Sequence, residues 1–187
     1  MTNPRNTNQE SICGDISYNK PLDFDVKTSE DRKEEGVKGY RKKHLKIFLR
    51  KKLAPKISKM KTKVILNMDR GFHCKSSELL DELKAGGAEN VEDVWFFPPN
   101  AGKLCNPLDN TLWHSMKSRI RKASPNGEKE LAKRAKKEFM NIPTKDLHSY
   151  FRNCGLTHRT DPYGRKSLIP QVKNVPLFFS IFCTFCK

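Results

Sequence analysis

Apolar residues recur at helical and strand spacings through the middle of the chain. A stripe that repeats every four residues predicts an amphipathic helix over 41–58, and its members are Leu45, Phe48, Leu49, Leu53 and Ile57. Short apolar runs follow at 64–68 and 91–97. Their length and β-branched residues are typical of buried strands, and the second run ends at Pro98-Pro99.

Helix signals surround these two runs. Ser76 or Ser77 can cap a helix that ends at Gly86-Gly87. Asn106-Pro107 opens another, whose apolar side is predicted to consist of Leu108, Leu112, Met116 and Ile120. Further helical patterns lie near 131–139 and 147–151. The order helix, strand, helix, strand, then helices favours an α/β fold with a largely parallel sheet.

Two strands are too few for an open sheet that buries both faces. Residues 41–158 are the expected domain, so either residues 1–40 supply further strands or the chain is part of a larger fold. Residues 1–40 are polar and charged and are expected to be weakly ordered, with one candidate strand at 11–18. Residues 159–187 form a tail whose apolar part, 175–186, is too short to span a bilayer. For that part a strand, a partner-binding segment and a sequence not selected to fold all stay open.

The charge of the chain, +16 overall, is concentrated in two segments. Residues 41–63 hold eleven basic and no acidic side chains, and residues 117–137 hold nine basic and two acidic ones. Such segments repel themselves unless an anion neutralises them, and the phosphates of nucleic acid are the commonest such partner. The start of the chain is polar, so the protein is not expected to be secreted.

Two carboxylates stand where ligands often bind. Asp69 follows the run at 64–68, and ligands of α/β sheets bind beyond the carboxyl ends of strands. Asp109 falls in the first turn of the helix that Asn106-Pro107 opens, where the helix dipole favours a negative charge.

These segments resemble the DDE/D transposases of the mariner superfamily. The run Val64–His73 is similar to the second catalytic segment of that family, where a strand ends in Asp and a His follows. The third segment of the family runs from a strand through Pro-Pro to Asn-Pro-hydrophobic-Asp/Glu and a Trp-bearing helix. It resembles Phe96–Pro99 followed by Asn106–Trp113, and the likeness continues into a basic helix at 116–122.

The resemblance implies a partial RNase H-like fold, with a mixed or parallel sheet flanked by helices and incomplete first strands. It implies metal-dependent cleavage and transfer of DNA strands, with Mg²⁺ or Mn²⁺ as cofactor. Asp69 and Asp109 would be metal ligands and catalytic residues, Asp15 would be the remaining catalytic carboxylate, and His73 would neighbour the site. The predicted DNA-binding side chains are Lys42, Lys43, Lys46, Arg50, Lys51, Lys52, Lys117, Arg119, Arg121 and Lys122.

The chain also departs from the family pattern. Arg70 stands where the family has Asn, and the first catalytic strand has only a vague match around Asp15. A truncated or rearranged catalytic domain with little strand-cleaving activity is therefore expected. A non-enzymatic basic nucleic-acid-binding protein derived from a transposable element, and a chain that does not fold stably, are the alternatives. The DNA-directed interpretation predicts a nuclear protein in a eukaryote and a cytoplasmic one otherwise, and it leaves open whether the chain forms a homodimer.

Overall fold

The computed structural model describes residues 11–69, 74–156 and 177–184 as a mixed α/β fold built on a five-stranded sheet. The strands are β1 (Ser11–Ser17), β2 (Pro21–Lys27), β3 (Val64–Met68), β4 (Val91–Phe96) and β5 (Leu177–Thr184). Their order across the sheet is β2-β1-β5-β3-β4. β1 is antiparallel to β2 and β5, whereas β3 is parallel to β5 and β4. Four strands therefore run in one direction, and β1 runs against them.

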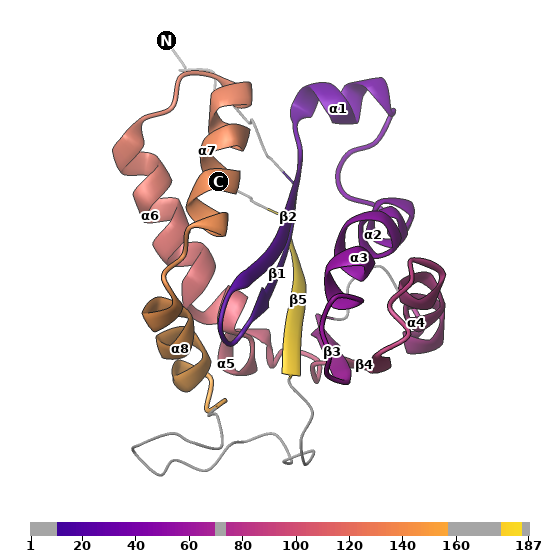
Figure 1. Cartoon of the computed structure of the whole chain (residues 1–187). Coiled ribbons are helices and arrows are strands. Elements are labelled where there is room, and N and C mark those ends of the chain that lie inside the picture. The colour runs from indigo at the N-terminus through magenta and orange to yellow at the C-terminus, as the bar shows by residue number, and fades with distance from the viewer. Residues whose placement is uncertain (1–10, 70–73, 157–176, 185–187) are drawn as a thin grey trace.

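Helices cover both faces of the sheet, with α6, α7 and α8 on one side and α2, α3 and α4 on the other (Figure 1). The helices are α1 (Ser29–Glu34), α2 (Lys42–Phe48), α3 (Ala54–Ile57), α4 (Ser76–Ala85), α5 (Gly102–Cys105), α6 (Trp113–Ala123), α7 (Glu128–Met140) and α8 (Thr144–Asn153). Two π-helical turns complete them, namely η1 (Leu49–Leu53) and η2 (Leu108–Leu112). This arrangement of three layers buries apolar side chains on both faces of the sheet.

One apolar core lies on each face of the sheet. The α6-side core contains Leu112, Trp113, Met116, Phe139 and Phe151, and the α2-side core contains Leu49, Leu53, Leu66, Met68 and Leu79. β1 contributes to both, because Ile12 and Ile16 belong to the first and Cys13 to the second. Alternate residues of a strand point to opposite faces, so β1 is buried on both sides.

The helix predicted over 41–58 is present as the continuous run of α2, η1 and α3. Pro55 has no backbone N–H for a helical hydrogen bond, and the π-turn lies just before it. In that turn the Ala54 N–H donates to the Leu49 carbonyl five residues back. The chain thus absorbs the proline through one wide turn, and the predicted stripe from Leu45 to Ile57 is buried.

The strands expected at 64–68 and 91–97 are confirmed as β3 and β4. The expected domain boundaries, 41–158, differ from the structure, because β1, β2 and β5 lie outside them and complete the sheet. The candidate strand at 11–18 is confirmed as β1, whose seven residues are all buried although three of them are polar. Residues 11–34 are thus ordered where weak order was expected, and the apolar tail supplies the central strand β5.

Candidate metal site and basic surfaces

Asp69 follows the carboxyl end of β3, which lies between β5 and the edge strand β4. The end of this strand is fixed by its neighbour β4, because the Phe97 N–H donates to the Met68 carbonyl over 2.9 Å. The Asp69 side chain is half-buried. The position is the strand-end position that the sequence predicted for a ligand-binding carboxylate.

Asp109 is held by a neighbouring amide in the π-turn η2. Asn106 is fully buried; its Oδ1 accepts a hydrogen bond from the Leu108 N–H, and its Nδ2 donates to Asp109 Oδ2, both over 2.9 Å. The predicted capping residue Asn106 therefore also orients the candidate ligand. Sequence reasoning gave it the first role and missed the second, although the spacing of three residues places the two side chains on one turn.

The fold brings Asp69 close enough to Asp109 for its charge to act on the Asp109 carboxyl. Burial raises the pKa of the Asp109 carboxyl, and the negative charge of Asp69 raises that pKa further. The hydrogen bond from Asn106 and the positive charge of Lys117 act in the opposite direction. Two carboxylates that disfavour each other's ionisation are a common feature of cation sites, because a bound cation removes the repulsion.

Asp15 is not brought to this pair. It lies in β1, where it pairs with Ser180 of β5, and Ser180 pairs with Met68 of β3. Side chains at paired positions share one face of a sheet, and Met68 belongs to the α2-side core. Asp15 is fully buried on that face. Burial raises the pKa of the neighbouring Cys13 thiol, and the negative charge of Asp15 raises that pKa further. Asp69 follows Met68 directly, so its side chain leaves the strand on the opposite face of the sheet from Met68 and Asp15.

The strand beside β3 brings no carboxylate either. β5 is parallel to β3, and the pairing of Met68 with Ser180 places position 181 level with Asp69. Residues 177–184 contain neither Asp nor Glu. His73, the predicted neighbour of the site, lies outside the described residues. Among the residues that the structure describes, no three His, Cys, Asp or Glu side chains gather as a metal-binding group.

Carboxylates are ligands that Mg²⁺ uses, since it usually binds through one or two of them and keeps several of its water molecules, and substrate phosphates often supply further oxygens. Asp69 and Asp109 are two of the three carboxylates that the resemblance implies for a two-metal site.

The basic stripe of α2 and η1 faces acidic residues of α4 in an ion-pair ladder formed by Lys42, Lys46, Arg50, Glu78 and Glu82. Lys42 Nζ lies 2.6 Å from Glu78 Oε2, and Arg50 Nη2 lies 2.8 Å from Glu82 Oε2. Between them, Lys46 Nζ lies 3.5 Å from Glu82 Oε1. Both sets are spaced by four residues, so each lies along one helix face. That shared spacing is the signal that sequence reasoning missed.

Acidic residues of β2 pair with the next lysines of the same run. Lys52 binds Asp25, which also accepts a hydrogen bond of 2.6 Å from the Tyr40 hydroxyl. Lys56 Nζ lies 3.0 Å from Asp23 Oδ2. The helix thus docks on the β1–β2 hairpin through charges as well as through its apolar stripe. Lys51, another predicted DNA-binding residue, is exposed and has no ion pair in the part of the chain that the structure describes.

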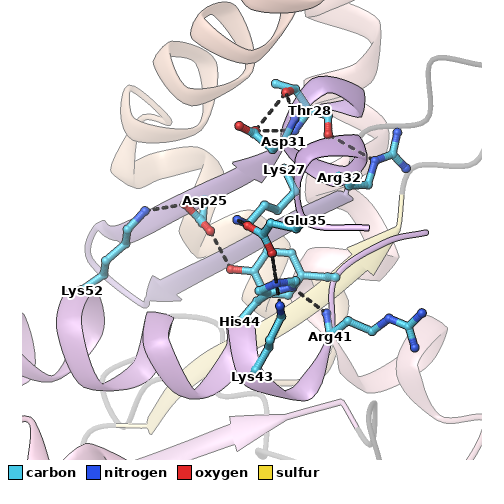
Figure 2. A network of polar contacts seen from close by, with 11 residues as sticks. Asp25, Lys27, Thr28, Asp31, Arg32, Glu35, Arg41, Lys43, His44 and Lys52 are labelled. Carbon is cyan, nitrogen blue, oxygen red and sulfur yellow. Dashed lines mark hydrogen bonds and ion pairs between the residues drawn. The ribbon is translucent and has the colours of Figure 1, made fainter. Parts of the chain in front are cut away.

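Glu35, just after α1, gathers three cationic or polar side chains (Figure 2). It binds Lys27 and the His44 ring, and its Oε2 lies 3.6 Å from Lys43 Nζ. The hydrogen bond from Lys27, together with His44, lowers the pKa of Glu35 to about 2. His44 Nδ1 accepts the Arg41 N–H over 2.9 Å, so Nε2 carries the proton that faces Glu35. The network ties α1 to the start of α2.

The four predicted cations of α6 divide into two kinds. Arg119 turns to internal partners, since Nη2 lies 3.2 Å from Ser115 Oγ and Nε lies 4.0 Å from Glu138 Oε2. Lys117 is half-buried and close enough to Asp109 to lower its pKa. Arg121 and Lys122 are exposed at the end of the helix, and no ion pair in the described ranges involves them.

Comparison with known proteins adds no assignment: no family model, curated protein or solved structure matches this chain. Across residues 11–69, 74–156 and 177–184, no helix is both long enough and apolar enough to cross a bilayer.

Proposed function

We propose that this chain is a transposase-type DNA-binding domain in which Asp69 and Asp109 hold one divalent cation and efficient strand cleavage is lost. The observation that carries the proposal is the proximity of these two carboxylates, since the charge of Asp69 raises the pKa of Asp109 although 39 residues lie between them in the sequence. Both residues are metal ligands in the arrangement that the resemblance to mariner-type transposases implies.

The strand order supports an RNase H-like fold. The resembled family begins with a strand that bears the first catalytic Asp, continues with a hairpin, and then reaches the strand that ends in the second Asp. Here β1 and β2 supply the hairpin, β3 supplies the strand that ends in Asp69, and β4 flanks it. The place between β1 and β3 is filled by β5 from the other end of the described chain.

This replacement accounts for the missing carboxylate. β5 lies beside β3 and contains neither Asp nor Glu. Asp15 cannot substitute for the missing carboxylate, because it is buried on the opposite face of the sheet. The site therefore keeps two ligands of three, which lowers the affinity for a pair of metal ions and removes one support for in-line displacement.

The roles of the residues follow from their contacts. A bound Mg²⁺ or Mn²⁺ would supply a positive charge to which a DNA phosphate oxygen can bind. Asp69 and Asp109 would hold it, and Asn106 would keep Asp109 oriented through its hydrogen bond. Lys117 places a positive charge near Asp109 and is suited to contact the same phosphate. These residues bind and orient DNA without requiring cleavage.

Metal binding tests the proposal. Mn²⁺ titration followed by electron paramagnetic resonance is expected to show one site in the wild-type protein, with affinity reduced at least about tenfold in Asp69→Asn and in Asp109→Asn. Asp81→Asn is the matched control, because Asp81 is an exposed carboxylate on α4. Equal Mn²⁺ affinity in all four proteins would refute the cation site and favour the alternative, a basic nucleic-acid-binding protein whose carboxylates are structural.

Cleavage needs a separate assay. Incubation with Mn²⁺ and end-labelled duplex DNA is expected to leave the DNA intact. Cleavage by the wild-type protein that Asp69→Asn abolishes would overturn the claim that strand cleavage is lost, and it would show that a ligand outside the described residues completes the site.

A further inference from the structure

A group of exposed cations lies on α6 and α7. These two helices pack against each other on one side of the sheet (Figure 1). Their exposed basic residues include Arg121, Lys122, Lys133, Lys136 and Lys137. Within the described residues, none of these five takes part in an ion pair, whereas Arg134 is paired with Glu138 at 2.8 Å.

The more basic segment, 41–63, has the opposite arrangement. Seven of its eleven cations have an acidic partner within 4.0 Å, on α4, β2, β4 or the residue that follows α1. A phosphate that approached this segment would compete with carboxylates already in place, so part of its attraction is cancelled.

The spacing on α7 sharpens the contrast. Lys133, Lys136 and Lys137 are three and four residues apart, so their side chains lie within one turn on the same face of the helix. Like charges at this spacing destabilise a helix by a few tenths of a kcal/mol per pair, and none of these three lysines has an ion pair within 4.0 Å among the described residues. An external polyanion would offset it.

We infer that duplex DNA binds across the exposed side of α6 and α7, through Arg121, Lys122, Lys133, Lys136 and Lys137, and that the basic stripe of α2 serves to dock helices. The inference rests on the proposed function and assigns its DNA-binding surface. The contacts are to phosphate oxygens, which lysine and arginine bind without reading the base sequence. Three of the five residues, Lys133, Lys136 and Lys137, were not among the predicted DNA-binding residues.

Two variants with equal charge change test the assignment. The first is Lys133→Gln/Lys136→Gln/Lys137→Gln on α7. The control is Lys51→Gln/Lys59→Gln/Lys61→Gln, which removes three exposed cations of the 41–63 segment that have no ion pair in the described part of the chain. Fluorescence anisotropy of a labelled duplex DNA, measured against NaCl concentration, gives the affinity and its salt dependence, and circular dichroism verifies that each variant is folded.

Each phosphate contact adds about 0.9 to the slope of the logarithm of the DNA-binding constant against the logarithm of the salt concentration. The α7 variant lacks three lysines, so its slope is expected to be about 2.7 less steep. Its affinity for DNA at 0.1 M salt is expected to fall roughly a hundredfold. The control variant should change the slope little. If the control loses as much slope as the α7 variant, the surface is assigned wrongly although the proposed function stands. If the wild-type protein binds no duplex DNA, the proposed function fails as well. Tighter binding of duplex RNA of the same sequence would overturn the assignment to DNA.

Discussion

Gly86 follows α4 and lies against η1 and the start of α3. Its substitution by Ala tests how tightly these elements pack. A Cβ atom at Gly86 would lie 2.4 Å from the Arg50 carbonyl oxygen and 2.5 Å from Ala54 Cβ. Both obstacles belong to the main chain or sit next to it, so they cannot rotate away. The φ angle of Gly86 is −89°, which Ala adopts without strain, and the expected cost is therefore steric.

Forcing extra atoms into a packed site costs about 1–3 kcal/mol, and two contacts near 2.5 Å place Gly86→Ala near the upper end of that range. Urea unfolding followed by circular dichroism measures the change in the free energy of unfolding. The control is Gly39→Ala, where the new Cβ would meet only Ser11 Oγ at 3.4 Å, an ordinary contact. A loss below about 0.5 kcal/mol in Gly86→Ala would show that η1 and α4 do not pack at this distance.

Three further predictions concern the site and the ion pairs. The proposed cation site predicts that the double variant Asp69→Asn/Asp109→Asn binds Mn²⁺ no more weakly than either single variant by more than about threefold, since one lost ligand already disrupts the site; fully additive losses would contradict a shared cation. Because the pKa of Asp109 is raised in the folded protein, its ionisation opposes folding, and stability is lost as the pH rises through that raised pKa. Thermal melts at pH 7 should accordingly show Asp109→Asn at least as stable as the wild type, and a clearly lower melting temperature would indicate that the carboxylate is structural. A double-mutant cycle on Arg50 and Glu82 should give a coupling of about 0.5 kcal/mol that decreases in 1 M NaCl, and a coupling that salt leaves unchanged would argue against a solvent-exposed ion pair.

The predicted DNA contacts of α2 illustrate the limit of charge counting. A run of cations in a sequence carries no information about acidic residues that fold against it. Glu78 and Glu82 lie about thirty residues after their partners, and Asp23 and Asp25 lie about thirty before theirs. The net charge of the segment therefore overstates the positive potential at its surface. For this reason we propose the less basic pair α6–α7 as the DNA-binding surface.

The helices and strands in the middle of the chain can be predicted from local patterns in the sequence. The stripe from Leu45 to Ile57 and the apolar run at 64–68 follow from periodicity, which depends only on neighbouring residues. The same holds for the cap at Asn106, where side chain and backbone lie within two residues.

The way in which distant segments share one sheet is seen only in the folded chain. Nothing local marks β1 as a strand with both edges paired, or β5 as the strand between β1 and β3, because strand pairing joins residues far apart in the chain. The packing of η2 places Asp109 near Asp69, whereas the pairing of β1 with β5 leaves Asp15 on the other face of the sheet, because successive residues of a strand point to opposite faces. The identity of the candidate ligands was thus readable from the residues, whereas their number at one site was set by the topology of the sheet.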